Sequence, residues 1–167
     1  MAGEKILLGH GVVSVAGTPI GLTRGGSEFV VDREFRNIEA DGDMGPVKGR
    51  VTLDSEIAKL TVNALETFTA DDMQKYYPAL SITEGEGVNT MTGTLEIVEG
   101  DYNDVVWVGK TLAGKAVTIT VKDALNMDSL SWKLEDKGEV VPALAFTACY
   151  DPEAMDTAPW TTEFATV

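Results

Sequence analysis

The fold is decided by residues Val30–Glu66, which read VVDREFRNIEADGDMGPVKGRVTLDSEIAKLTVNALE. Across Ser27–Ile38 apolar and polar side chains alternate, and this period of two is typical of a half-buried strand. Val47–Leu65 alternates in the same way, but its phase changes near Ala58–Lys59, which predicts a β-bulge or bend there. Between the two lies Glu39–Gly49, which is rich in turn-forming residues. The stretch therefore predicts two long antiparallel strands joined by an exposed connection.

One helix is predicted shortly after the second strand. Thr69 can cap its N-terminus, and the helix is expected over Ala70–Leu80. Asp71 and Asp72 then lie near the positive end of the helix dipole. Pro78 should stop or distort the last turn, because it cannot donate a backbone hydrogen bond. An apolar stripe at helical spacing should face a sheet: Met73, Tyr76, Tyr77 and Leu80.

Further strands are expected in the second half of the chain. Thr92–Val98 and Val105–Thr111 flank a turn, and Ala116–Lys122 alternates regularly. Ser129–Leu134 and Val140–Tyr150 are predicted to pair as a hairpin with a glycine in its turn. These elements predict a mainly β fold: two packed antiparallel sheets in a sandwich or barrel-like arrangement, with one α-helix packed across them.

The length of 167 residues suits one domain that can bury a core. We expect residues 1–167 to form that domain, with an N-terminal arm over residues 1–25 and a C-terminal tail over residues 151–167. Ile6–Leu8 is too short an apolar run for a signal peptide. The uncharged segment Ile6–Thr23 is rich in glycine, serine and threonine, so we expect no membrane insertion.

The charge excludes one class of function and leaves two interpretations open. The chain has 13 basic and 27 acidic residues, a formal net charge of −14. Such a surface repels nucleic-acid phosphates wherever salt does not screen the charges, so a nucleic-acid-binding protein is not expected. The acidic surface either keeps the protein soluble or faces DNA without holding it. Composition alone does not choose between these two interpretations.

No catalytic constellation is visible. Gly109–Lys110–Thr111 resembles the end of a phosphate-binding loop, but Asp104 stands where the first glycine belongs and no helix follows. His10, the only histidine, lies near Ser14 without a third partner or an oxyanion-hole sequence. We therefore expect that the protein is not an enzyme and uses no cofactor.

Metal sites are not expected either. Asp41–Gly45 begins like a calcium loop, but glycine occupies the third ligand position and no glutamate closes the loop. Asp101–Asp104 fails in a similar way. Cys149 has no companion thiol, so we interpret it as a small buried apolar residue and expect no disulfide within the chain.

The order and spacing of two longer stretches resemble a known family. Val30–Glu66 carries an acid-Arg-Glu-aromatic-Arg strand, an acidic Asp-Gly loop, a Gly-Pro-Val-Lys-Gly turn and a second long strand. Leu130–Glu153 (LSWKLEDKGEVVPALAFTACYDPE) looks like a closing hairpin that ends in Tyr-Asp-Pro, and Pro159–Trp160 follows. Together these stretches resemble the major tail tube proteins of long-tailed, siphovirus-like bacteriophages.

The resemblance implies a structural protein of the phage tail tube. Family members are similar in fold, form hexameric rings and stack these rings into a tube whose lumen conducts DNA to the host cell. The implied partners are further copies of the chain and the tape measure, tail terminator and distal tail proteins, while double-stranded DNA passes without specific binding. The implied location is the virion tail, assembled in the cytoplasm of the bacterial host. Two alternatives remain open: a related tail component (a contractile-tail tube or a distal tail protein) and an unrelated β-sandwich binding module.

Two groups of candidate site residues follow from the resemblance. The polar faces of the two long strands are expected at the inner wall, and the connection between the strands is expected to reach the next ring. The candidate lumen-lining residues are Glu28, Asp32, Glu34, Asp54 and Glu56, and the candidate ring-stacking residues are Asp41, Asp43, Met44, Gly45, Pro46, Val47 and Lys48.

Overall fold

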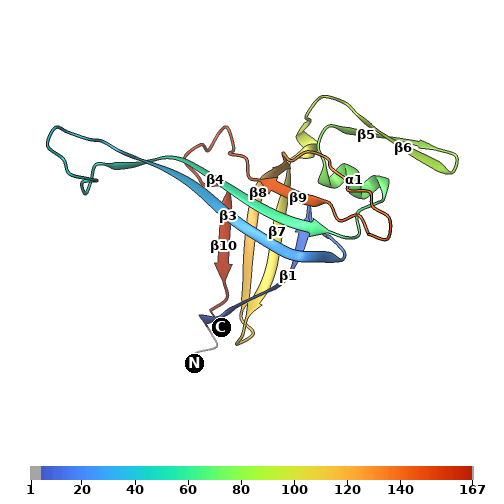
Figure 1. The fold of residues 1–167 in the computed structure, drawn as a ribbon, viewed down its shortest axis with the longest axis horizontal. Coiled ribbons are helices and arrows are strands. Elements are labelled where there is room, and N and C mark those ends of the chain that lie inside the picture. The colour runs from blue at the N-terminus through green and yellow to red at the C-terminus, as the bar shows by residue number, and fades with distance from the viewer. Residues whose placement is uncertain (1–4, 167) are drawn as a thin grey trace.

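The computed structural model describes residues 5–166 and consists mainly of antiparallel strands (Figure 1). One α-helix and one short 3-10 helix accompany the strands. The elements in chain order are β1 (Leu7–Val15), β2 (Thr18–Pro19), β3 (Thr23–Asn37), β4 (Val51–Ala64), α1 (Ala70–Tyr76), β5 (Leu80–Gly85), β6 (Val88–Gly93), η2 (Glu99–Asp101), β7 (Asn103–Thr111), β8 (Ala116–Asn126), β9 (Ala143–Thr147) and β10 (Trp160–Phe164).

Eight strands form two antiparallel layers that share β8, in the order β2-β1-β7-β8-β9-β4-β3, with β10 also paired to β8. β8 pairs with β7 and β10 as far as Val121 and with β7 again at Ala124, whereas Leu125 and Asn126 at its end pair with β9. The strand is irregular just before this change of partner: Asp123 has a positive φ of 46° and donates its backbone N–H to Asp104 Oδ1 at 3.0 Å. The predicted fold class, mainly β with two antiparallel sheets and one α-helix, is confirmed.

The hydrophobic core lies between the two layers. Alternate residues of β4, among them Ala58, Leu60 and Val62, are buried on the face that looks toward β7 and β8. Phe29 and Val31 on β3 lie on the same face, because each pairs directly with one of these β4 residues. The other layer contributes these buried side chains: Val13, Val15, Val105, Trp107, Val117 and Val121.

The helix begins as predicted and ends earlier. Thr69 Oγ1 accepts a hydrogen bond from the backbone N–H of Asp72 at 3.2 Å, which confirms the predicted cap. Met73 and Tyr76 are buried, so the predicted apolar stripe faces the core. The helix stops at Tyr76, two residues before Pro78. In the described part of the chain no helix is long and apolar enough to cross a membrane.

Both ends of the chain contribute strands. Residues 1–25 were expected to be an N-terminal arm, but β1 within them pairs with β7 and buries Val13 and Val15 in the core. Residues 151–167 were expected to be a tail without periodic structure, but β10 pairs with β8 through five residues, from Trp160 to Phe164. Within the described residues 5–25 and 151–166 the arm and tail assignments are therefore corrected, because β1 and β10 pair with strands of the sheet, while residues 1–4 and 167 lie outside the described residues.

Three further predictions are wrong in detail. Ser129–Leu134 forms no strand, and Trp132 within it instead packs edge-on against Phe68 with ring centroids 5.3 Å apart. Thr92–Val98 is mostly loop, while an unpredicted hairpin of β5 and β6 precedes it. The long hairpin has register shifts between Thr23 and Ser27 and between Glu34 and Phe35, the second with a bulge at Asp54, and none at Ala58–Lys59.

Candidate interaction site on the long hairpin

Strands β3 and β4 form a ribbon that extends well beyond the two packed layers (Figure 1). Only Lys59–Asn63 of β4 pair with β9, so within the described residues the outer part of the ribbon has no further strand beside it. We call this outer part, residues 34–55, the arm. The arm presents two opposite faces and a loop at its tip.

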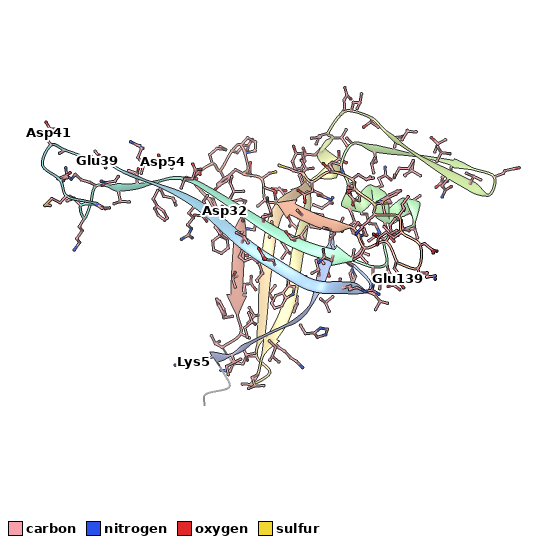
Figure 2. All side chains as sticks on the ribbon, in the orientation of Figure 1. Lys5, Asp32, Glu39, Asp41, Asp54 and Glu139 are labelled. Atoms are coloured by element: carbon pink, nitrogen blue, oxygen red, sulfur yellow. The ribbon has the colours of Figure 1, made fainter. Side chains whose placement is uncertain are left out.

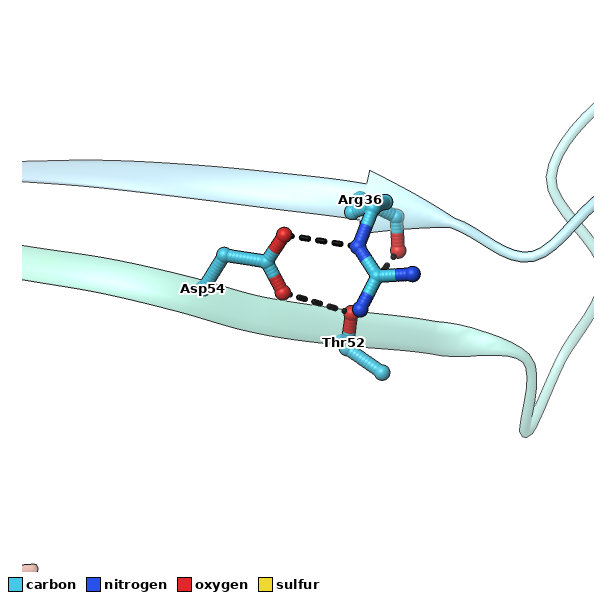
Figure 3. A network of polar contacts seen from close by, with 3 residues as sticks. All are labelled: Arg36, Thr52 and Asp54. Carbon is cyan, nitrogen blue, oxygen red and sulfur yellow. Dashed lines mark hydrogen bonds and ion pairs between the residues drawn. The ribbon is translucent and has the colours of Figure 1, made fainter.

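The bulge on the arm is held by a polar network (Figure 3). Arg36 Nε donates to Asp54 Oδ2 at 2.7 Å, and Thr52 Oγ1 donates to Asp54 Oδ1 at 3.0 Å. The hydrogen bond from Arg36, followed by that from Thr52, lowers the pKa of Asp54 below its ordinary value. The Asp54 carboxylate therefore stays ionised, and its two oxygens accept hydrogen bonds from Arg36 and Thr52 on the same arm.

The loop at the tip is ordered by one carboxylate. Asp43 Oδ2 accepts the backbone N–H of Ala40 at 2.8 Å, and Asp43 Oδ1 accepts Arg50 Nη2 at 2.8 Å. The backbone of Asp43 in turn donates to the Ala40 carbonyl at 3.1 Å. Both carboxylate oxygens are thus used inside the loop, and residues 5–166 contain no group of three or more side chains that could hold a metal ion.

The seven candidate ring-stacking residues all lie in this loop at the tip of the arm (Figure 2). Met44 is fully exposed at a position where no fold requirement explains a large apolar side chain. Val47 is half-buried and Asp43 supports the loop. The remaining members of the group are exposed to solvent: Asp41, Gly45, Pro46 and Lys48.

One face of the arm is apolar and uncovered. Phe35 pairs directly with Leu53, and Asn37 pairs with Val51 two positions further out. These residues continue the row that carries Phe29 on β3, so they lie on the face that packs against the core nearer the body. Phe35 is 65% exposed, and Leu53 and Val51 are each 47% exposed. The core-facing side of β3 and β4 therefore extends beyond the region that the rest of the protein covers.

The opposite face of the same ribbon is mainly acidic. Glu28, Asp32 and Glu34 alternate along β3 and are all exposed. Asp54 shares this face, because its carboxylate contacts the side chain of Arg36 on the same side. Lys59 also lies on it, opposite Val30. The structure thus brings four of the five candidate lumen-lining residues onto one face, together with two basic residues that were not among the candidates, Arg36 and Lys59.

Glu56 is the fifth candidate and lies on the other side of the ribbon. Its Oε1 accepts a hydrogen bond from Trp160 Nε1 at 2.6 Å, and its Oε2 lies 3.4 Å from Arg33 Nε. The Glu56 side chain is only 13% exposed. It joins β4 to β10, so it does not belong to the acidic face.

His10 and Cys149 lie on different parts of the chain's fold, the first on β1 and the second after β9. His10 is exposed on β1. Cys149 is half-buried, and its Sγ lies 3.8 Å from the Thr147 carbonyl oxygen. Burial, followed by the nearby charge of Asp123, raises the pKa of the Cys149 thiol above its ordinary value, so its thiolate is disfavoured.

No protein-family model matches the chain, and no curated protein matches it. Among solved structures, the fold is similar to the anti-feeding prophage cap, described as the tube terminating cap and determined by cryo-EM. The TM-score is 0.56 at 13% sequence identity, over 96% of this chain and 91% of the cap chain. At this identity the likeness establishes a shared fold. The match covers nearly the whole of both chains, so it includes both layers of this protein and its long hairpin.

Proposed function

We propose that this protein is a structural subunit of a bacteriophage tail, and that it builds the tail tube from hexameric rings that stack on one another. Its role is assembly and not catalysis. The fold it shares with a tube terminating cap of prophage origin supports this proposal. The order of motifs across Val30–Glu66, which resembles tail tube proteins, supports it independently.

The observation that carries the proposal is the uncovered apolar face of the arm. Three large apolar side chains, Phe35, Val51 and Leu53, lie together in solvent on a ribbon that extends beyond the two packed layers. Exposed patches of this kind mark surfaces that bind another protein. β3 adds a second open surface, because in the described residues it ends the strand order and its outer edge is unpaired along Thr23–Asn37. A closed ring of subunits would remove such an edge.

The two faces of the ribbon then take different roles in the proposed tube. The acidic face, with Glu28, Asp32, Glu34 and Asp54, lines the lumen and repels DNA phosphates, so that DNA slides without binding. Glu56 is left out of this lining because it lies on the other face of the ribbon, where it contacts Trp160 and Arg33. The tip loop, residues 41–48, makes the contact between stacked rings. The proposed partners are further copies of the chain and the tape measure, tail terminator and distal tail proteins of the virion tail.

A second candidate is favoured by one specific observation. The similar fold is that of a tube terminating cap, a protein that ends a tube. A terminator of this kind would form a ring that binds the end of a tube and does not stack on itself. The two candidates differ in a visible way, since a tube subunit gives long polymers whereas a cap gives single rings.

The experiment compares sedimentation velocity of the parent protein with that of a Phe35→Ser, Leu53→Ser variant. Both side chains are largely exposed, so the variant should fold normally while its assembly is lost. A matched control, Val88→Ser with Leu95→Ser, removes two exposed apolar residues away from the arm and should assemble like the parent. Unchanged assembly of the arm variant would contradict the role assigned to the arm.

A further inference from the structure

The apolar face of the arm needs a partner surface, and two regions outside the arm each bring several exposed apolar side chains together. One lies beside the end of β8 and contains Ile97, Met127 and Leu130. The other lies at the far end of the β1-β7-β8-β10 layer, near both chain termini (Figure 1). Charge distinguishes between these two regions.

The second region is basic in a strongly acidic protein. Backbone hydrogen bonds hold its parts together: the Leu112 N–H donates to the Ile6 carbonyl at 2.8 Å, and the Ala165 N–H donates to the Ala116 carbonyl at 2.9 Å. Residues 5–12, 108–118 and 160–166 contain three lysines and one glutamate, a net charge of 3 − 1 = +2, whereas the whole chain carries −14. We call this region the basic end. Its exposed members include Lys5, Ile6, Leu7, Lys110, Leu112 and Phe164, and its one glutamate, Glu163, is exposed as well.

The arm has the complementary combination of apolar and acidic groups. Residues 34–55 contain five acidic and three basic residues, a net charge of 3 − 5 = −2. Two of the basic residues are ion-paired within the arm, Arg36 with Asp54 and Arg50 with Asp43. Glu39 and Asp41 then stand exposed at the tip (Figure 2). The other apolar region is a poorer match, because Glu96, Glu99 and Asp128 lie in the same segments as its apolar residues.

We propose that the arm of one copy docks on the basic end of a second copy. In this contact Phe35, Val51 and Leu53 cover apolar side chains of the basic end, and Glu39 and Asp41 face Lys5 and Lys110. Opposite charges set the register of the contact, while burial of the apolar side chains supplies its affinity. The two surfaces are different patches of one chain, so the contact is heterologous and propagates from copy to copy. The inference rests on the proposed self-assembly and names the surface that receives the arm.

The test uses disulfide trapping between two populations of the protein. In a Cys149→Ser background, one population carries Asp41→Cys and the other carries Lys110→Cys, so that each chain has a single thiol. After the two are mixed, assembled and mildly oxidised, a covalent dimer that needs both populations is expected. The matched control pairs Asp41→Cys with Asp128→Cys at the other apolar region, and here little dimer is expected.

Charge exchange provides the second measurement. Glu39→Lys with Asp41→Lys, or Lys5→Glu with Lys110→Glu, should each raise the critical concentration for assembly about tenfold or more, because like charges then face each other. Combining all four changes in one chain should restore assembly. Polymers that form without a disulfide between the Asp41→Cys and Lys110→Cys chains would overturn this inference. So would a chain with all four charge exchanges that fails to assemble. Either result would leave the proposed function standing. A parent protein that never assembles would overturn both.

Discussion

The indole Nε1 of Trp160 donates a 2.6 Å hydrogen bond to Glu56 Oε1, and this contact fixes the root of the arm to the last strand of the other layer. The Trp160 ring also packs against Phe29, with centroids 5.7 Å apart. Arg33 adds an ion pair to the same carboxylate at 3.4 Å. The arm therefore leaves the body from a fixed point, although its outer part is uncovered.

The first prediction concerns this anchor. Glu56→Ala should lower the free energy of unfolding by about 1.5–3 kcal/mol, the range for hydrogen bonds to charged groups. Glu56→Gln keeps an acceptor oxygen for the indole and loses only the half-exposed ion pair, so it should cost less than Glu56→Ala. Urea unfolding followed by tryptophan fluorescence measures both. Equal losses in the two variants would mean that the hydrogen bond to Trp160 contributes nothing.

The second prediction concerns two glycines beneath one aromatic ring. The indole of Trp107 covers the Cα atoms of Gly11 and Gly109, so a methyl group at either position would collide with ring atoms. Gly11→Ala should destabilise the fold by about 1–3 kcal/mol through overpacking. Gly9→Ala, two residues away on the same strand, meets open space and is the control. Thermal unfolding of both variants checks the difference, and equal melting temperatures would contradict the packing described.

The third prediction concerns alkaline pH. Burial raises the pKa of Tyr76 and Tyr77, and the charges of Asp72 and Asp128 respectively add to the rise. A raised pKa in the folded state means that stability is complete below the unfolded value of about 10 and falls as pH passes through the folded values. Unfolding free energies measured from pH 8 to 11.5 should show this fall. Tyr76→Phe should show a smaller fall, and an identical pH profile would exclude Tyr76 as a cause.

The fourth prediction concerns the acidic face. Changing Glu28, Asp32 and Glu34 to lysine replaces repulsion of DNA with attraction, because wall charges act over a Debye length of about 8 Å at physiological salt. In phage particles with intact tails, ejection of the genome should slow or stop. A control with three lysines elsewhere, at Glu84, Glu86 and Glu96, should eject normally. Parental ejection rates in the first variant would show that this face does not line the channel.

The sequence predicted the long hairpin because apolar and polar residues alternate on both sides of a turn-rich segment. The apolar pattern of β4 does change phase, as expected, from Leu53 to Ala58. The position of the change was misjudged because Ile57 is apolar yet 46% exposed on the acidic side of the ribbon. An exposed isoleucine and a buried one look the same in an alternating pattern, so only the register of the strands locates the bulge at Asp54.

Other elements depend on tertiary contacts that periodicity does not report. β1 contains Gly9 and Gly11, which lower its strand propensity, although Gly11 is required beneath Trp107. Ser129–Leu134 was predicted as a strand, but it is a loop in which the ring of Trp132 packs on Phe68. The exposure of the apolar face of the arm was also missed. Alternation shows which face of a strand is apolar, but it does not show how far along the strand the rest of the protein covers that face.

Self-assembly into stacked rings can be seen by electron microscopy of the purified protein over a range of concentrations and salt conditions. We expect six-fold rings at low concentration and tubes of stacked rings as concentration rises. Single rings that never stack would favour the terminating cap over the tube subunit. A particle that remains monomeric under every condition, with sedimentation velocity giving the same result, would contradict the account.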